Sequence, residues 1–225
     1  MKINEITNII QGEGIYVGTP EIMIRTQGCS MNCVNCDSPE TKSFKKGKSM
    51  SVNKILEEVS KYKQKNVCIS GGNPIEQNHH ELLDLVRKLK QHNYLVNIEM
   101  TGCDKISSLE ETLLNKVDFI SFDIKTPSSG SLYQFNGSSA LWAFKAQYKA
   151  VVSDWRDYNY VKDMINSYRN IRRDKFVITP AWNYNSDLDR DFVQKLTKQI
   201  LKDGLGCRLI PQTHKMVYDS TKKGV

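Results

Sequence analysis

Short strand-like runs alternate with longer helix-like runs along this 225-residue chain. The strand-like runs are rich in Val, Ile and Phe, and the helix-like runs repeat apolar residues at helical spacing. Such alternation is typical of βαβ units, which place successive strands in parallel in one sheet. The predicted strands are residues 21–26, 67–70, 94–99, 117–123, 146–152, 176–179 and 207–210. The predicted helices are residues 51–59, 82–89, 109–114, 158–168 and 187–201.

About six such units, joined by right-handed crossovers, curl into an incomplete (β/α)6-type barrel with mostly parallel strands. The chain is too short for a full eight-unit barrel, so we expect an α/β fold with a single domain over residues 1–225. Ligands in such sheets bind at the carboxyl ends of the strands. Polar or glycine-rich segments follow the predicted strands at 25–36, 70–74, 99–102, 123–125 and Thr179. They predict one site at that edge.

The composition is that of an ordinary globular protein, with 39% hydrophobic and 25% charged residues. There is no run of eighteen apolar residues, and the first five residues do not resemble a signal peptide. We therefore expect a cytoplasmic protein that does not bind membranes. The net charge of +7 invites a nucleic-acid partner, but most basic residues are scattered beside acids, which is typical of solvated helix faces. No nucleic-acid partner is predicted.

Cys29, Cys33 and Cys36 form a C-x3-C-x2-C motif. Disulfides are rare in the cytosol, so three cysteines within eight residues indicate a metal site. Three thiolates from one loop can ligate three irons of a 4Fe–4S cluster and leave the fourth iron open to another ligand.

Structural zinc is the alternative interpretation of this motif. It normally needs four ligands, often in paired C-x2-C units. No further Cys or His lies near the loop, so a fourth ligand would have to come from Cys68, Cys103 or Cys207.

The cysteine spacing resembles that of radical S-adenosylmethionine (SAM) enzymes. In those enzymes SAM chelates the open iron, and an electron from the cluster cleaves it to a 5′-deoxyadenosyl radical. Residues 70–74, Ser-Gly-Gly-Asn-Pro, follow a predicted strand as the GGEP-type motif of that superfamily does. The glycines of residues 70–74 would let the backbone approach the methionyl amino group of SAM. Asn73 occupies the position where Glu is commoner in the superfamily.

Several further segments resemble the 7-carboxy-7-deazaguanine synthase family. Residues 10–29 contain its Q-G-E-G…G-x-P…R-x-x-G-C signature. Residues 36–38, 98–102 and 210–215 are similar to its C-D-(S/T), E-T-x-G and L-P-Q-x-H-K motifs. The resemblance runs from residue 5 to 225, is weaker between about 130 and 205, and is strongest to Bacillus-type members.

This resemblance implies a carbon–nitrogen lyase that contracts the ring of 6-carboxy-5,6,7,8-tetrahydropterin by radical chemistry. The products would be 7-carboxy-7-deazaguanine and ammonia, on the route to queuosine and other deazapurines. The implied cofactors are a 4Fe–4S cluster, reusable SAM that abstracts the substrate C6 hydrogen, and Mg²⁺. The implied partners are a flavodoxin or ferredoxin as electron donor and a second copy of the chain in a homodimer.

Arg25 ends a predicted strand and faces the opposite side from Ile22 and Ile24, so we expect it to point into the barrel. A guanidinium there can bind a carboxylate through two hydrogen bonds, although a structural salt bridge is an equal alternative from the residues alone. The resemblance favours substrate binding.

Matching motif by motif, the resemblance implies three sets of site residues. Those for the substrate are Ile10, Gln11, Gly12, Arg25, Ser70, His214 and the C-terminal Val225. Those for SAM are Asn35, Cys36, Asp37, Gly72, Asp123, Ile124 and Lys125. Cys29, Cys33 and Cys36 would hold the cluster, and Ser38 the Mg²⁺.

Some of these assignments keep an alternative. Ser38 also suits a turn that precedes a proline, and His214 also suits a structural role. Glu13 suits either a substrate contact or a turn. Val225 would by default belong to a frayed end. Asp123 and Ile124 depart from the Ser-Pro-Lys of many family members, whereas Lys125 is retained, and Thr179 departs from their Gln-Pro.

Two other functions remain open at this stage. An activating enzyme for a glycyl-radical protein has the same cysteine spacing but lacks the Q-G-E-G and P-Q-x-H-K segments together. A metal-binding nucleic-acid module is suggested by the net charge alone.

Overall fold

In the computed structural model, residues 1–103, 106–131, 134–182 and 188–218 are described. Within them nine strands form one sheet in the order β3-β1-β2-β4-β5-β6-β7-β8-β9. The strands are β1 (Lys2–Ile10), β2 (Pro20–Thr26), β3 (Lys48–Ser49), β4 (Asn66–Gly71), β5 (Leu95–Thr101), β6 (Phe119–Ile124), β7 (Ala146–Val152), β8 (Phe176–Pro180) and β9 (Arg208–Leu209). The α-helices are α1 (Val52–Val59), α2 (His79–Gln91), α3 (Ser108–Lys116), α4 (Trp155–Ser167), α5 (Arg190–Asp203) and α6 (His214–Val217).

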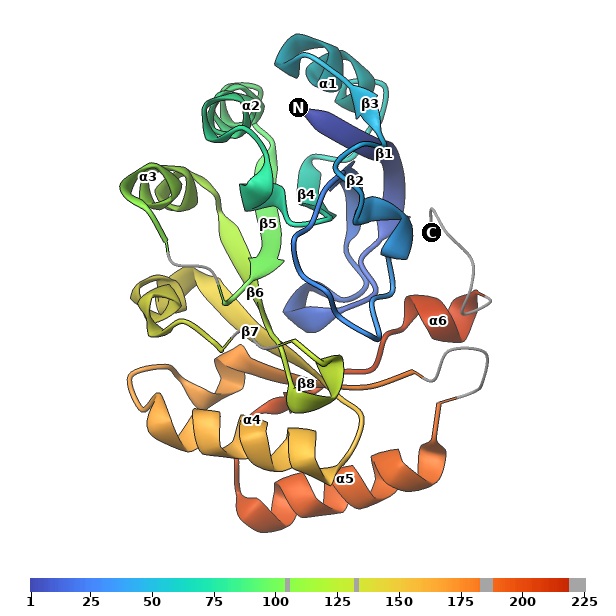
Figure 1. Cartoon of the computed structure of the whole chain (residues 1–225), viewed down its shortest axis with the longest axis vertical. Helices are drawn as coiled ribbons and strands as arrows, with labels where there is room; N and C mark the ends of the chain where they lie inside the picture. The colour runs from blue at the N-terminus through green and yellow to red at the C-terminus, as the bar shows by residue number, and fades with distance from the viewer. Residues whose placement is uncertain (104–105, 132–133, 183–187, 219–225) are drawn as a thin grey trace.

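The strands from β2 through β4 to β9 pair in parallel, and α1 to α5 lie on the outer side of the curved sheet (Figure 1). The predicted α/β fold with mostly parallel strands is therefore confirmed. β1 and β3 were not predicted: β1 runs antiparallel to both β2 and β3. The residues of β1 alternate too weakly between apolar and polar to show a strand, because only part of the strand packs on the core.

Helix boundaries follow local capping chemistry. The Ser51 side chain accepts a hydrogen bond from the Lys54 amide and starts α1, as predicted. α5 starts at Arg190 instead of residue 187, because Asp189 caps its first turn. α4 begins earlier than predicted, at Trp155, for the same reason: Asp154 caps it.

One face of each central strand supplies the apolar core. Ile24, Ile69, Ile98 and Ile120 are aligned across four neighbouring strands, and all four are fully buried. They belong to one cluster with the buried leucines of α2. Helix packing on this outer face is what holds the sheet in its curve.

The other face of the same strands is polar. Arg25, Ser70, Glu99, Asp123 and Lys149 come from five neighbouring strands, and all line the cavity on the inner side of the sheet. Since strand residues alternate between faces, each apolar neighbour of these residues points to the helices instead. The sheet thus separates an apolar outer core from a polar interior.

The C-terminal segment lies against the start of the chain. The amide of Thr213 donates to the carbonyl of Gly12 over 2.9 Å, so α6 sits beside the loop after β1 (Figure 1). This contact brings the two ends of the sheet together at the mouth of the cavity. In the part of the chain that the structure describes, no helix combines the length and apolar character needed to cross a bilayer.

Removing a core leucine should be costly in this layered arrangement. Leu85 of α2 is fully buried, and we expect Leu85→Ala to lower the free energy of unfolding by about 2–5 kcal/mol, because it leaves a cavity. Leu201 of α5 is 75% exposed, and Leu201→Ala should change it by no more than about 0.5 kcal/mol. Urea denaturation followed by circular dichroism measures both. Equal losses would contradict the assignment of the core to the outer face.

Candidate active site

A cavity of about 270 Å³ opens at the carboxyl ends of the strands. Almost every residue proposed from the sequence lines it. These residues are Ile10, Gln11, Gly12, Arg25, Cys29, Cys33, Asn35, Cys36, Asp37, Ser38, Ser70, Gly72, Asp123, Ile124, Lys125 and His214. Of the residues assigned to the substrate, SAM and the metals, Val225 alone is not placed, because it lies outside the described residues. Residues more than 200 positions apart in sequence therefore meet in one place.

The cysteine loop is held by contacts from three directions. The Lys42 Nζ donates to the carbonyl of Cys33 over 2.9 Å. Both oxygens of the Glu76 carboxylate accept from the amide of Ser30, at 3.1 and 2.9 Å. The carbonyl of Ser129 accepts from the amide of Val34 over 2.8 Å. These contacts from the surrounding protein shape the loop.

Gly72 fits closely against the cysteine loop. Its amide donates to the carbonyl of Thr26, and the amide of Asn73 donates to the carbonyl of Gly28, at 3.0 and 2.9 Å. A Cβ at position 72 would lie 2.1 Å from the Gly28 carbonyl oxygen. Gly28 itself has a φ of +111°, a conformation that favours glycine. Glycine is therefore required at 72 by the loop next to it, independently of any ligand.

The cysteine side chains fit a cluster better than a single metal ion. In the described ranges, no three His, Cys, Asp or Glu side chains are grouped so that they could hold one ion. A 4Fe–4S cluster makes a different demand, because each thiolate binds its own iron and the three sulfurs need not meet at one point. Burial raises the pKa of the Cys29 thiol to about 11, so a bound cluster must displace a proton there.

The remaining cysteines do not complete a zinc site in this conformation. Cys68, Cys103 and Cys207 are absent from the cavity lining. Cys68 is fully buried, and its sulfur accepts a hydrogen bond from the Asn97 side-chain amide. The side chain of Cys68 points to the polar interior of the sheet, which no sequence pattern revealed.

Arg25 is oriented by an acidic residue of the chain itself. Its Nε donates to Glu5 Oε1 over 2.7 Å, and its Nη1 donates to the Ser38 hydroxyl over 3.3 Å. That hydroxyl donates in turn to Asp37 Oδ1 at 3.3 Å. The salt bridge to Glu5 fixes the guanidinium plane, so its outer N–H groups can face an anionic ligand.

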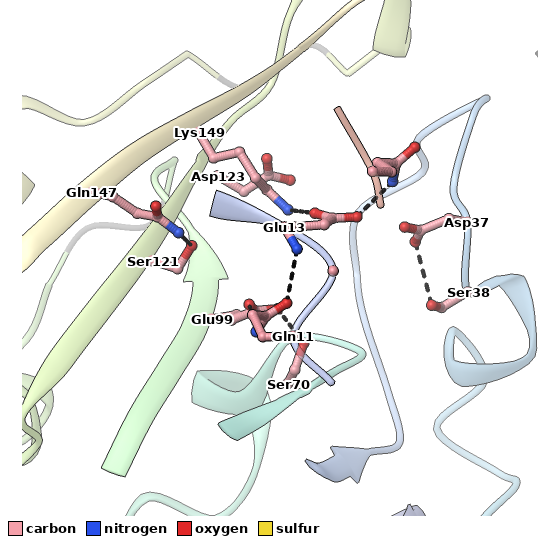
Figure 2. A network of polar contacts seen from close by, with 12 residues as sticks. Gln11, Glu13, Asp37, Ser38, Ser70, Glu99, Ser121, Asp123, Gln147 and Lys149 are labelled. Carbon is pink, nitrogen blue, oxygen red and sulfur yellow. Dashed lines mark hydrogen bonds and ion pairs between the residues drawn. The ribbon is translucent and has the colours of Figure 1, made fainter. Parts of the chain in front are cut away.

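A buried ion pair joins the loop after β1 to β7. Lys149 Nζ donates to Glu13 Oε2, and Gln212 Nε2 donates to Glu13 Oε1 over 2.5 Å (Figure 2). Burial opposes the charge on Glu13, but Lys149, His214 and Gln212 more than offset it and lower its pKa to about 2. Burial also works against a charge on His214 and lowers its pKa, so this imidazole is neutral near pH 7.

Asp123 and Lys125 form a second ion pair, at the end of β6. Burial disfavours the charge of Lys125, but Asp123 and Cys33 reverse the effect and raise its pKa above the ordinary value. The ammonium group therefore stays charged beside the cysteine loop. Thr179 is fully buried in β8 but is not part of the cavity lining.

Gln11 bridges the buried carboxyl group of Glu21 and the half-buried carboxyl group of Glu99. Its Nε2 donates to Glu21 Oε1 at 2.6 Å and to Glu99 Oε1 at 3.3 Å. Ser70 Oγ donates to Glu99 Oε2 over 2.8 Å (Figure 2). Burial raises the pKa of Glu21 to about 8, with a contribution from the nearby Glu99. Burial likewise raises the pKa of Glu99, although Lys149 opposes the shift.

The sequence did not single out Glu5, Glu21, Glu99 or Lys149 as site residues. Glu99 was visible only as part of a motif, and Lys149 lies inside an apolar strand where charge is rare. An isolated charged residue within a strand facing a buried layer is the signal that could have found Glu21 and Lys149. Only the tertiary structure shows that Glu21 shares Gln11 with Glu99 and that Lys149 pairs with Glu13.

Gly72→Ala should disrupt the cysteine loop without a large effect elsewhere. The added methyl group meets backbone, which cannot rotate away, so we expect a loss of at least half of the iron bound after anaerobic reconstitution. At Gly137 a Cβ would meet only the Tyr168 ring at 3.2 Å, and Gly137→Ala should bind iron normally. Iron and sulfide per chain measure both. Full iron in Gly72→Ala would show that the loop tolerates the methyl group.

Comparison with known proteins agrees with this geometry. Residues 10–140 match the family model "4Fe-4S single cluster domain". The 7-carboxy-7-deazaguanine synthase of Aquifex aeolicus is 30% identical, over 96% of this chain and 92% of that protein. Those of Thermoplasma acidophilum and Koribacter versatilis are 31% and 32% identical, over 97% and 100% of both chains.

Solved structures share the fold. QueE from Escherichia coli superposes with a TM-score of 0.69 at 21% identity, over 94% of this chain and 93% of that one. Streptococcus suis SuiB bound to S-adenosylmethionine gives 0.58 at 13% identity, over 84% of this chain and 49% of that one. With full-length relatives above 30% identity and a matching cluster domain, the chain belongs to the 7-carboxy-7-deazaguanine synthase family.

Proposed function

We propose that this protein is a radical SAM lyase that converts 6-carboxy-5,6,7,8-tetrahydropterin to 7-carboxy-7-deazaguanine and ammonia, for queuosine or other deazapurine synthesis. The observation that carries the proposal is the meeting of the cysteine loop, Arg25 and the buried carboxyl groups in one cavity. Full-length relatives that carry the synthase name support it. The chemistry of the cavity suits an anionic, nitrogen-rich substrate.

Arg25 is proposed to bind the substrate carboxylate. Glu5 already occupies its Nε, so the guanidinium is fixed before the substrate arrives, and less entropy is lost on binding. Glu99 lies on a strand two places away and, when ionised, accepts hydrogen bonds from N–H groups. A ligand with a carboxylate at one end and N–H donors at the other matches both groups.

Gln11 contributes to this site in a different way from that expected. Its amide hydrogens are engaged by Glu21 and Glu99, and its carbonyl oxygen accepts from the amide of Glu13 over 3.1 Å. We infer that Gln11 shapes the pocket instead of reaching the substrate with its amide. Ile10 and Gly12 remain proposed backbone contacts, and Ser70 and His214 proposed side-chain contacts.

Cys29, Cys33 and Cys36 would hold the cluster, and the residues around them would hold SAM. When bound, the cluster supplies the electron and SAM the radical with which the reaction begins. Lys125 keeps a positive charge near the cysteine loop, and Asp123 fixes its ammonium group. Proposed backbone contacts to SAM come from Asn35 to Asp37, Gly72 and Ile124, all of which line the cavity.

Ser38 is the proposed ligand for Mg²⁺. Its hydroxyl lies beside the Asp37 carboxylate but also beside the Arg25 guanidinium, which repels a cation. Mg²⁺ keeps several waters and takes substrate oxygens. We therefore infer that this ion binds appreciably only with the substrate carboxylate, which would supply the missing negative charge.

We also propose a homodimer, a cytoplasmic location and one domain over residues 1–225. The single sheet supports the one domain, and three cysteines within eight residues, a pattern that suits a metal cluster, support a reducing compartment. The electron donor is proposed to be a flavodoxin or ferredoxin. Val34, 83% exposed within the cysteine loop, and the exposed Phe44, Lys45 and Lys46 nearby form a surface that suits a small acidic carrier.

The activity is tested with the reconstituted protein, SAM, a reductant and carboxytetrahydropterin. We expect 7-carboxy-7-deazaguanine and ammonia in equal amounts. Arg25→Gln should lower kcat/KM on the order of 100-fold, because losing one partner of a buried charged pair costs about 2–5 kcal/mol. Arg172→Gln, at an exposed position, should leave it unchanged. Chromatography with mass spectrometry measures the product.

Failure to form the deazaguanine would refute this function. A glycyl radical appearing on an added partner protein, seen by electron paramagnetic resonance, would favour an activating enzyme instead. Bound zinc with salt-sensitive RNA binding would favour the nucleic-acid module.

The surface for the electron donor is tested by charge reversal. Lys45→Glu/Lys46→Glu should slow reduction of the cluster by flavodoxin about tenfold at low salt, because electrostatic steering is lost. Reduction by dithionite, a small molecule, should not change. Lys198→Glu/Lys202→Glu, with the same charge change on α5, serves as control. Stopped-flow absorbance follows the cluster, and an equal slowing in both variants would contradict a local docking surface.

A further inference from the structure

Glu21 is a buried acidic residue to which the proposed reaction assigns no role. It lies near the start of β2, is 3% exposed, and is not part of the cavity lining. Strand alternation places it on the same face as Met23 and Arg25, which do line the cavity. Glu21 therefore lies inside the sheet, one layer below the site.

The hydrogen bonds around Glu21 lead directly to the site. The Gln11 amide donates to Glu21 Oε1 at 2.6 Å and to Glu99 Oε1 at 3.3 Å. The other oxygen of Glu99 accepts from Ser70 at 2.8 Å. The Gln11 carbonyl oxygen accepts from the Glu13 amide, so the Gln11 side chain cannot turn over without losing three hydrogen bonds. Glu21 and Glu99 are thus the two ends of one fixed bridge.

The two carboxyl groups cannot both carry a charge easily. Glu21 is buried, Glu99 is half-buried at the cavity, and both bind one amide donor. Like charges in such a setting favour one proton between the pair. The titratable groups around Glu21 are Glu99 of β5 and Cys68 of β4. Of the cations in this layer, Arg25 of β2 acts on Cys68, and Lys149 of β7 acts on Cys68 and favours an ionised Glu99. These surroundings favour the proton on Glu21 and the negative charge on Glu99.

We propose that Glu21 is a positioning residue for the reaction: it fixes the Gln11 amide, and Gln11 fixes the direction and single charge of the Glu99 carboxylate that faces the cavity. This inference rests on the proposed function, because it concerns the same substrate site. It adds a residue that touches neither the substrate nor a cofactor and acts through Gln11.

The arrangement predicts a pH dependence with a definite sign. Burial raises the pKa of Glu21 to about 8, so this group is neutral below that pH and ionises above it. Ionisation of Glu21 adds a second negative charge next to Glu99. The two carboxylates, which share one Gln11 amide, then repel each other. We therefore expect kcat/KM to have its full value well below pH 8 and to fall as the pH rises through this value.

The test compares kcat/KM of the wild type and Glu21→Gln between pH 6.5 and 9.5. Glutamine keeps the size of the side chain and an oxygen that accepts from Gln11, but it cannot ionise. In the wild type, kcat/KM should fall about tenfold per pH unit above pH 8. In Glu21→Gln that decline should be absent, with activity at pH 7 within about threefold of the wild type. If Glu21 had a merely structural role, the Glu21→Gln substitution would not change the pH profile.

Glu110→Gln is the matched control. Glu110 is also buried but lies in the capping box of α3, where glutamine serves equally well, so its pH profile should equal that of the wild type. An infrared difference spectrum of the reconstituted proteins gives a readout independent of turnover. The C=O band of a protonated carboxylic acid should be present in the wild type, vanish near pH 8, and be absent in Glu21→Gln.

The outcomes separate the two proposals. No product from the wild type would overturn the proposed function. Turnover by the wild type with the same decline above pH 8 in Glu21→Gln would overturn the role of Glu21 and leave the function standing. An infrared band that survives in Glu21→Gln would overturn that role as well, because the proton would then lie elsewhere.

Discussion

The structure depends on the pairing of charged groups on the inner face of the curved sheet. Burying an unpaired charge costs several kcal/mol, so ion pairs on this face stabilise the fold. Arg25 forms a salt bridge with Glu5, and Lys149 forms one with Glu13. These pairs keep the interior polar and open at one end. The apolar core lies on the opposite face, under the helices, where Ile24 and its aligned neighbours pack.

The paired charges also tie distant segments together. Glu13 accepts hydrogen bonds from Lys149 of β7 and from Gln212 of the C-terminal segment. The Thr213 amide donates to the carbonyl of Gly12. An incomplete barrel has two free edges, and these contacts draw its ends towards each other. The same groups shape the cavity, so stability and ligand binding share residues here, as is common at functional sites.

Glu21, Gln11 and Glu99 show how such pairing extends below the cavity. A carboxyl group that touches no ligand still determines the charge of one that faces the cavity, because both bind the same amide. Residues of this kind leave no motif in a sequence. Glu21 stands beside the apolar run 22–24 of its strand, and nothing near it in the chain indicates that Glu99 is its partner.

The sequence by itself determined the parallel α/β fold, most helices and strands, and the residues of the cysteine loop, because these depend on local periodicity and spacing. It missed the antiparallel β1, whose pattern is weak, and the partners of Arg25 and Gln11. Only the tertiary structure decided that Gly72 must be glycine because the Gly28 carbonyl lies against it. It also decided which carboxyl groups face each other. Burial and pairing depend on the curvature of the sheet, which brings together residues that are far apart in the chain.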